Sequence, residues 1–270
     1  MNILYYIIIY IIGTVFGSFF TLAIYRIPLK KDITHERSFC PNCNHKLVFW
    51  DMIPVVSYLL YRGKCRYCGE KIRIRYLLLE VISGFIFLIE YIFLNMTFPY
   101  FDISKIIFYI SFIFMYITIV IICGIDKEYR KIHLGVLLFG FIAYGIYILY
   151  LYITQKTGVY RYGIYLVLMS VLCILYTTFL KLKAERKYIL EVLMFLVYLT
   201  AVLGLELMLV VIALTLVLIG INQLLLYIRK VLKDKPDILQ ENFIPKVRIG
   251  FFLGVSSIII KIIETYLEYH

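Results

Sequence analysis

The chain has 270 residues, of which 63% are hydrophobic and only 17% are charged, and its mean hydropathy is +0.91. Soluble domains are about 45–50% apolar and about 25% charged, so this composition excludes a soluble globular protein, and it also excludes a disordered chain and a coiled coil. The net charge of +11 would suggest a nucleic-acid partner in a soluble protein. In a membrane protein, basic residues report orientation instead, and we expect no nucleic-acid partner. We therefore interpret the chain as an all-α polytopic membrane protein.

A helix that crosses a bilayer needs about 20 apolar residues. Eight apolar runs come close to this length or exceed it, and we expect each of them to form a transmembrane helix: 3–25, 76–95, 105–125, 134–153, 163–181, 188–204, 207–228 and 249–267. The stretch 188–228 is nearly continuous, and we divide it at Gly204-Leu205-Glu206, where a tight helical hairpin would fit. Without this division the chain would have seven spans.

The placement of charge favours eight spans. Residues 26–75 contain eleven Lys and Arg against four acids, and the loops 126–133, 181–187 and 229–248 are also basic, whereas the alternate connections hold few charges. The positive-inside rule places the basic loops in the cytoplasm and both termini outside. The sequence thus predicts a first transmembrane helix (1–25), a cytoplasmic insertion (26–75) and a seven-helix membrane domain (76–270).

The insertion contains two C-x2-C pairs, formed by Cys40 with Cys43 and by Cys65 with Cys68. Each pair lets two thiolates reach one metal ion, and the two pairs together complete a tetrahedral shell. Because disulfides are disfavoured in the reducing cytoplasm, we predict a structural zinc site, with redox dithiols or unbound thiols as the alternative. Four thiolates leave no open coordination position, so this zinc is expected to serve folding rather than catalysis.

The residues that follow the two pairs, Asn44 and Gly69, suit the tight turns of zinc knuckles. The remaining cysteines, Cys123 and Cys173, lie in apolar runs and are expected to be small core residues.

Carboxylates within membrane spans are costly, which makes them functional candidates. Asp126 closes the third span at its cytoplasmic boundary. It is either an interfacial acid balanced by basic neighbours or one half of a carboxylate pair that shares a proton and activates a water. The partner would be Glu191, in an apolar stretch of the sixth span, or Glu185, in the basic loop before it. Glu80 could serve structure or a polar site, and the acids expected to serve packing or the interface are Glu90, Glu206 and Glu264.

Four segments carry a family resemblance. The first span ends in GSFFTLAIYRIP (17–28), the insertion contains DMIPVVSYLL (51–60) and RGKCR (62–66), and the next span opens with RYLLLE (75–80). They are similar to GSFLNVVIYRLP, DNIPVLSYL, RGRCR and RYPLVE of the type IV prepilin leader peptidases, which are bifunctional membrane enzymes of the GxGD aspartyl protease group. Residues 244–245 (IP) and 250–253 (GFFL) are loosely similar to that family's closing IPFGPFL.

The resemblance implies an enzyme of type IV pilus assembly and protein secretion in the bacterial plasma membrane. It would cleave the leader of prepilins or pseudopilins at the cytoplasmic face and then methylate the new N-terminal residue with S-adenosylmethionine. Asp126 stands where the family has its first catalytic Asp. The second belongs to a GxGD-x-K motif, which is absent here. Glu191 is the closest acid in register, and Glu185, two residues before Lys187, imitates D-x-K.

Three functional hypotheses remain open. The first is an active prepilin peptidase that uses Asp126 with Glu191 or Glu185. The second is a family member that is impaired in proteolysis and acts as a methyltransferase or a pilin-assembly factor. The third is a membrane transporter with a zinc-stabilised cytoplasmic domain, which would require polar residues that line a path through the helix bundle.

Overall fold

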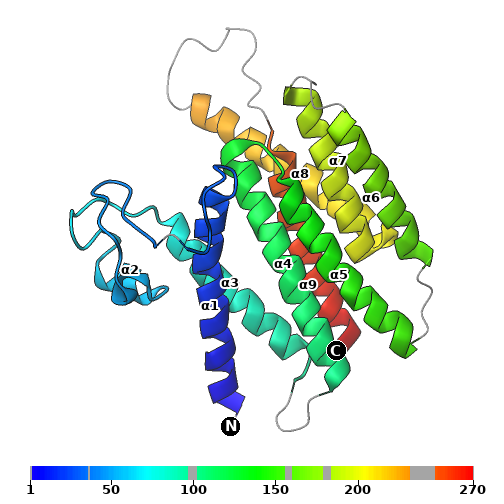
Figure 1. Cartoon of the computed structure of the whole chain (residues 1–270), viewed down its shortest axis with the longest axis horizontal. Helices are drawn as coiled ribbons and strands as arrows, with labels where there is room; N and C mark the ends of the chain where they lie inside the picture. Colours follow the sequence, from blue (N-terminus) through cyan, green and yellow to red (C-terminus); the bar gives the residue numbers. More distant parts are fainter. Residues whose placement is uncertain are drawn as a thin grey trace. The chain divides into compact units, whose positions relative to one another are not determined.

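The computed structural model describes residues 2–35, 37–96, 102–155, 160–178, 184–231 and 247–269 (Figure 1). Within these ranges the protein is helical, with two isolated β-bridges in the insertion. The long helices are α1 (Asn2–Arg26), α3 (Arg75–Phe93), α4 (Ile103–Tyr129), α5 (Leu134–Gln155), α6 (Tyr160–Thr178), α7 (Ala184–Leu203), α8 (Leu205–Val231) and α9 (Ile249–Tyr269). The 3-10 helix η1 (Phe49–Met52) and the short helix α2 (Val56–Leu60) lie in the insertion. The all-α fold class is confirmed.

Within the described residues, six helices have the length and the apolar composition needed to cross a membrane: α1, α3, α4, α5, α8 and α9. The described part of α6 is apolar over a shorter stretch, Tyr162–Tyr176, and α7 carries the charged residues 185–187 together with Glu191. All eight helices lie within four residues of the spans predicted from the sequence. The chain is therefore a multi-pass membrane protein.

Gly204 separates α7 from α8, as the sequence predicts. Its φ of +84° lies in the left-handed region, which glycine adopts without steric cost. The N–H of Gly204 donates a 3.0 Å hydrogen bond to the carbonyl of Thr200, which closes the last turn of α7. The division of 188–228 into two helices is confirmed.

The structure divides into two compact units, whose boundaries fall inside α4 and α9. One unit comprises Met1–Ile117 and Glu264–His270, and the other comprises Thr118–Ile263. The first unit contains α1, the insertion and α3, and the second contains α5 to α8.

In the first unit, α1 and α3 pack with their backbones in close contact. A Cβ on Gly13 would lie 2.7 Å from the carbonyl oxygen of Ser83, and a Cβ on Gly17 would lie 2.6 Å from the Cα of Glu80. On α3, a Cβ on Gly84 would lie 2.7 Å from the ring of Tyr10. Gly13 and Gly17 form a G-x-x-x-G pair, which lets two membrane helices approach closely and gain van der Waals contact where lipid supplies no hydrophobic driving force.

Aromatic rings and buried hydrogen bonds complete the core of this unit. The ring centroids of Phe87 and Tyr116 lie 5.9 Å apart at an angle of 76°, and the hydroxyls of Ser83 and Tyr116 are 3.1 Å apart. Glu90 is fully buried and accepts a 2.9 Å hydrogen bond from the hydroxyl of Thr265. This contact between α3 and α9 agrees with the prediction that Glu90 serves packing.

In the second unit, α7 packs against α5, α6 and α8. Tyr198 of α7 is fully buried. A Cβ on Gly140 of α5 would lie 3.0 Å from the Tyr198 ring and 2.6 Å from the Thr118 side chain, so the helices meet closely here. The hydroxyl of Tyr144 donates a 3.1 Å hydrogen bond to the carbonyl of Val202, which ties α5 to the end of α7. These contacts hold α7 in a fixed rotation about its axis.

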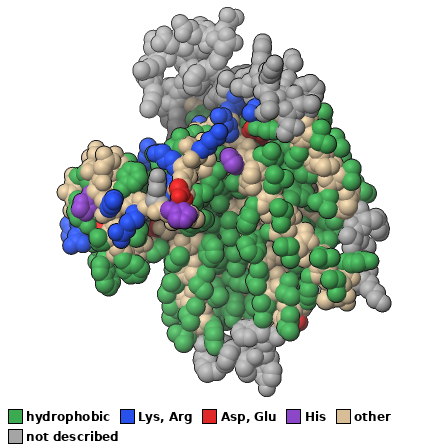
Figure 2. All heavy atoms as spheres, viewed as in Figure 1, with side chains coloured by type: hydrophobic (Ala, Val, Ile, Leu, Met, Phe, Trp, Pro, Cys, Tyr) green, Lys and Arg blue, Asp and Glu red, His purple; other side chains and the backbone are tan. Residues whose placement is uncertain are grey.

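Large hydrophobic side chains are exposed along the membrane-spanning helices. Ile153 is 69% exposed and Leu209 is 70% exposed, and Figure 2 shows hydrophobic side chains over much of the visible face. In a soluble protein such patches would mark an interface. Here the lipid acyl chains cover them, as expected for a membrane protein.

Candidate functional site

The four cysteines of the insertion form one cluster. The sulfur atoms of Cys40, Cys43, Cys65 and Cys68 all lie within 4.8 Å of one another, and those of Cys40 and Cys68 are 3.9 Å apart. Tetrahedral zinc with Zn–S bonds of about 2.3 Å places its sulfurs about 3.8 Å apart, so the donor set and its spacing fit zinc. This cluster is the one metal-ligating group of His, Cys, Asp or Glu found among the described residues.

The two cysteine pairs have matching backbone geometry. In each pair the N–H of the first cysteine donates to the carbonyl of the residue five positions later, over 3.0 Å from Cys40 and 2.8 Å from Cys65. The residue after each second cysteine is left-handed, with φ of +55° at Asn44 and +72° at Gly69. Asn and Gly tolerate this conformation best, which confirms the tight turns predicted for both knuckles.

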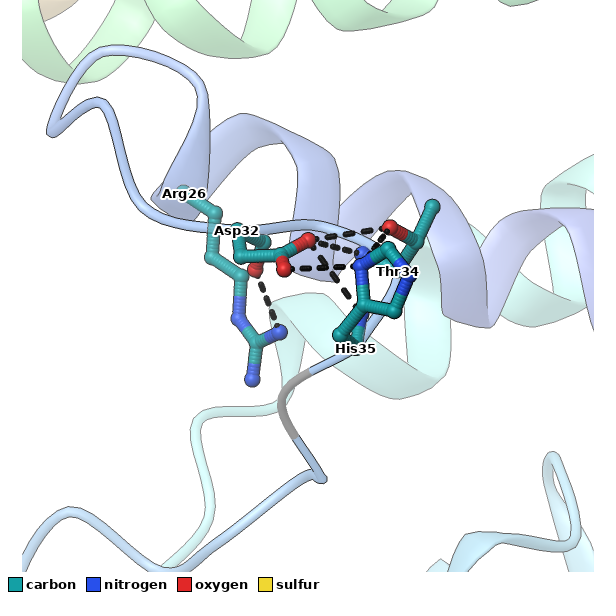
Figure 3. Close-up of polar contacts among 4 residues, drawn as sticks. All are labelled: Arg26, Asp32, Thr34 and His35. Carbon is teal, nitrogen blue, oxygen red and sulfur yellow. Dashed lines mark hydrogen bonds and ion pairs between the residues drawn. The ribbon is translucent and has the colours of Figure 1, made fainter.

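A second polar cluster orders the chain where it leaves α1 (Figure 3). The guanidinium of Arg26 is buried and donates hydrogen bonds to the carbonyls of Asp32, over 2.7 Å, and Arg37, over 3.3 Å. The Asp32 carboxylate accepts hydrogen bonds from the backbone N–H of Thr34, over 2.8 Å, and of His35, over 3.2 Å. The backbone N–H groups of Thr34 and His35 hold the pKa of Asp32 well below its ordinary value.

Glu80 joins the insertion to the membrane helices of the first unit. Its Oε2 accepts a 2.7 Å hydrogen bond from the N–H of Val55, and the Ser18 side chain lies near the same carboxylate. Val55 has a φ of +63°, which is unusual for a β-branched residue and costs about 1–3 kcal/mol. Three segments that carry the family resemblance, 17–28, 51–60 and 75–80, therefore meet at this carboxylate, and the role of Glu80 in the structure is to hold the insertion.

Asp126 lies in the last turn of α4, and its side chain is fully buried. Its Oδ2 accepts a 2.8 Å hydrogen bond from the N–H of Phe251, close to the start of α9. The first N–H groups of a helix have no intrahelical partner and carry partial positive charge, so a carboxylate is stabilised there. A Cβ on Gly250 would lie 3.2 Å from Oδ2, so the absence of a side chain at this position leaves room for the carboxylate.

Buried polar atoms without a hydrogen-bond partner gather around Asp126. Its Oδ1 has none, and neither has the hydroxyl of Tyr188 on α7, although the hydroxyl lies close enough to interact with the carboxylate. The guanidinium of Arg130 lies 4.9 Å from the centre of the Tyr188 ring, and its buried Nε also lacks a partner. Since more than about 90% of buried polar atoms are hydrogen-bonded in proteins, this group offers donors and an acceptor to a small polar ligand.

Glu191 lies three residues after Tyr188 on α7 and is 4% exposed. Its Oε2 accepts a 2.9 Å hydrogen bond from the N–H of Ile132, in the connection between α4 and α5, and its Oε1 accepts a 3.2 Å hydrogen bond from the hydroxyl of Tyr176. Lys131 and Lys187 add favourable electrostatic interactions. Both oxygens of Glu191 are thus engaged, whereas Asp126 keeps one oxygen free.

Asp126 and Glu191 lie in the same unit, one at the end of α4 and the other bonded to the segment that follows α4. They make no hydrogen bond to each other. The side chain of Glu185 lies outside the described residues, as do most of the predicted basic loops 181–187 and 229–248 and the segment 244–245.

Tyr188 is the residue at this site that the sequence analysis missed. It is one of 26 tyrosines, and its residue type carries no signal of function. Its spacing does, because residues three apart on a helix share a face, which places Tyr188 beside the candidate Glu191.

Comparison with known proteins gives matches to the N-terminal part of the chain. Residues 11–94 match the family described as the bacterial peptidase A24 N-terminal domain. Three proteins named prepilin leader peptidase/N-methyltransferase are similar: those of Myxococcus xanthus (39% identity, 31% of this chain and 25% of that protein), Vibrio cholerae (40%, with 30% and 35% covered) and Bacillus subtilis (39%, with 30% and 32% covered).

These matches span a quarter to about a third of the length of those relatives. No solved structure is significantly similar to the chain. Residues 11–94 thus resemble part of the prepilin leader peptidases, in agreement with the resemblance that the sequence motifs indicate. They cover most of α1, the insertion and α3, and they end before Asp126.

Proposed function

We propose that this protein is a prepilin leader peptidase and N-methyltransferase whose substrates are type IV prepilins or pseudopilins. The match of residues 11–94 to the bacterial peptidase A24 N-terminal domain and their similarity to prepilin leader peptidases support the proposal. The observation that carries it is the buried Asp126: one oxygen is fixed by the N–H of Phe251, the other has no hydrogen-bond partner, and the hydroxyl of Tyr188 lies near the carboxylate. A carboxylate held in this way can accept a proton from a water that attacks a peptide carbonyl.

Leader cleavage is a hydrolysis, and its proton balance defines the roles of the residues. Asp126 Oδ1 takes a proton from the attacking water, whose oxygen forms a bond to the scissile carbonyl carbon. The carbon–nitrogen bond then breaks, the amine of the mature pilin leaves with the proton that Asp126 took from the water, and the leader keeps the new carboxyl group. We assign the second carboxyl to Glu191, with Glu185 as the alternative, because two nearby carboxyls that share a proton suit this exchange.

The Asp126 site is suited to a substrate that enters from the membrane surface. Asp126 lies at the end of a membrane-spanning helix, and Arg130, Lys131 and Lys187 surround the two carboxylates. By the positive-inside rule this basic end faces the cytoplasm of a bacterium, with both termini of the protein on the other side of the plasma membrane. We propose no nucleic-acid partner, since the basic residues set the orientation of the protein in the membrane.

Methylation would follow cleavage. The freed N-terminal amine of the pilin would take a methyl group from S-adenosylmethionine, which leaves as S-adenosylhomocysteine while the amine releases a proton. The names of the relatives support this activity, and we assign no residues to the methyl donor. Zinc bound by the four cysteines would hold the insertion folded, since its thiolate shell is closed.

The engagement of Glu191 favours a second candidate function. Both of its oxygens are hydrogen-bonded to the protein, and the chain lacks the glycines of GxGD. A family member without an available second carboxyl would retain prepilin binding or methylation and would act in pilin assembly.

One experiment separates the two functions. The purified full-length protein and its Asp126→Asn variant are each reconstituted with a prepilin, and the products are identified by mass spectrometry. Cleavage by the wild type and none by the variant supports the peptidase. If zinc-loaded, folded wild-type protein leaves the leader intact, the peptidase proposal fails, and a methyl group gained by a pre-cut pilin would support the second function.

A further inference from the structure

The insertion exposes an apolar edge although it lies outside the membrane-spanning helices. The helices η1 and α2 are in contact with each other, and we define the apolar edge as their exposed hydrophobic side chains. Its members are Phe49 (69% exposed), Trp50 (67%), Met52 (38%), Val56 (48%), Leu59 (63%) and Leu60 (69%). A group of large exposed apolar side chains such as this one marks a surface that contacts another protein or a membrane.

The hydrogen bond between Val55 and Glu80 fixes the depth of the apolar edge relative to the membrane. Val55 connects η1 to α2, and its N–H is bonded to a residue five positions into α3. At a rise of about 1.5 Å per residue, Glu80 lies about 7.5 Å along the helix from its start at Arg75. Since α3 has 19 residues and just suffices to span the hydrocarbon core, Arg75 lies near the boundary between headgroups and acyl chains. Glu80 then lies about 7.5 Å inside that boundary, within the depth of about 5–10 Å to which interfacial elements bury their apolar side chains.

The charge around the apolar edge fits the same surface. The insertion has a charge of +7, from eleven basic and four acidic residues between 26 and 75. Basic residues that are exposed in the structure include Arg62, Lys64, Lys71 and Arg73, and Figure 2 shows hydrophobic and basic side chains together on this part of the surface. Anionic headgroups attract such residues when they lie near the surface, and tryptophan is enriched at the headgroup level.

We propose that the apolar edge of η1 and α2 lies in the interfacial region of the lipid bilayer, on the side where α3 begins, and that anionic lipid strengthens this contact. The insertion is then held against the membrane at three places: its two ends, which continue into α1 and α3, and the apolar edge between them. This surface fixes the height of the zinc knuckles above the bilayer. The proposal is independent of the catalytic function.

The protein carries its own reporter, because Trp50 is the one tryptophan in the chain. The full-length wild-type protein is reconstituted in vesicles whose lipids carry bromine at a shallow or a deep acyl position. We expect emission at a shorter wavelength than that of tryptophan in water, the strongest quenching from the shallow bromines, and little quenching by aqueous iodide. Vesicles that contain anionic lipid should give stronger lipid quenching than neutral vesicles, and salt should reduce the difference.

Two variants calibrate the measurement in a Trp50→Phe background. Lys46→Trp places the reporter at an exposed position in the first knuckle, where iodide should quench it and bromolipids should not. Leu209→Trp places it at an exposed position on α8, where bromolipids should quench it. If wild-type Trp50 behaves like the Lys46→Trp reporter, the proposal is wrong. Protection of Trp50 from both quenchers would also overturn it, since another protein surface would then cover the edge.

Discussion

The carboxylate of Asp126 is hydrogen-bonded through Oδ2 to the backbone N–H of Phe251, across 125 positions of sequence. This contact fixes the orientation of the carboxyl group, whose other oxygen has no hydrogen-bond partner, and the hydroxyl of Tyr188 lies near the carboxylate. One oxygen of Asp126 thus has a structural role, and the other is available for catalysis. Substitutions that keep one role and remove the other test both.

Asp126→Asn and Asp126→Ala should differ in stability but not in activity. The Asn amide oxygen can still accept from Phe251, so we expect an unfolding temperature close to that of the wild type. Ala leaves the Phe251 N–H without its partner, which should cost about 1–3 kcal/mol. Both variants lose the general base, so prepilin cleavage should fall by at least about a hundredfold. Thermal unfolding in detergent, measured beside cleavage, checks this, and equal stability of the two variants would contradict the role of the contact.

Tyr188→Phe should lower the rate of cleavage without lowering stability. The Tyr188 hydroxyl has no hydrogen-bond partner in the structure, so its removal breaks no hydrogen bond that stabilises the fold. If the hydroxyl helps Asp126 to hold the reacting water, kcat should fall by up to about a hundredfold, while KM for the prepilin stays near the wild-type value. Tyr198→Phe is the matched control, since it removes another buried, unbonded hydroxyl from the same helix. A wild-type kcat for Tyr188→Phe would exclude this role.

Glu191→Gln and Glu185→Gln distinguish the two candidates for the second carboxyl. Gln can still accept from the N–H of Ile132, so Glu191→Gln should fold, but it cannot take a proton. We expect Glu191→Gln to abolish cleavage and Glu185→Gln to leave most of it, as measured by mass spectrometry of the released leader. The reverse result would move the assignment to Glu185, and activity in both variants would remove the carboxylate pair from the mechanism.

Removal of zinc should unfold the insertion and leave the membrane helices intact. Cys43→Ser takes one thiolate from the shell and should lower the bound zinc from one ion per chain, as measured by elemental analysis. Hydrogen exchange should then rise across residues 38–71, because the knuckles depend on the metal for their folding. Cys173→Ser changes a cysteine outside the cluster and should keep the full zinc content. Unchanged exchange in metal-free protein would show that the insertion folds without zinc.

Much of the fold follows from local sequence patterns. Runs of apolar residues locate the eight helices, because each span must form all of its backbone hydrogen bonds within the bilayer. The break between α7 and α8 is also predictable, because it depends on the left-handed backbone conformation that Gly204 adopts. The cysteine spacing likewise predicts a cluster that forms within about thirty residues of chain, since two-residue gaps suit zinc ligation.

Contacts between helices could not be predicted in this way. The approach of Gly17 to Glu80, and of Tyr188 to Asp126, depends on how each helix is rotated about its axis. That rotation is set by packing over the whole interface, and the runs of Ile, Leu and Tyr in this chain carry little amphipathic signal. Asp126 and Glu191 could be identified as acids within apolar segments, whereas Tyr188 could not be distinguished from the many other tyrosines of the chain.

The turn after α1 should resist acid. Hydrogen bonds from the N–H groups of Thr34 and His35 hold the pKa of Asp32 below its ordinary value of 3.8. A group whose pKa is lowered by folding stabilises the fold fully above its unfolded pKa and loses this contribution as the pH falls through the folded pKa. Hydrogen exchange of residues 27–35 should therefore be constant between neutral pH and about pH 5 after correction for the intrinsic rate. Asp32→Asn should show faster exchange than the wild type in this range. Identical exchange in the two proteins would show that the Asp32 carboxylate does not stabilise the turn.

Gly17→Ala should destabilise the first unit and displace the apolar edge. The new Cβ would lie 2.6 Å from the Cα of Glu80, which is a backbone atom, so α1 and α3 must move apart at a cost of about 1–3 kcal/mol. Gly145→Ala is the matched control, because its Cβ would meet no atom within 4 Å and alanine favours a helix.

Because Glu80 holds Val55, the same movement should loosen the link between the insertion and the membrane. In Gly17→Ala, Trp50 should become more accessible to aqueous iodide, whereas in Gly145→Ala it should remain as in the wild type. A lower unfolding temperature without a change at Trp50 would mean that the apolar edge keeps its place through its own contact with lipid and does not depend on the hydrogen bond to Glu80.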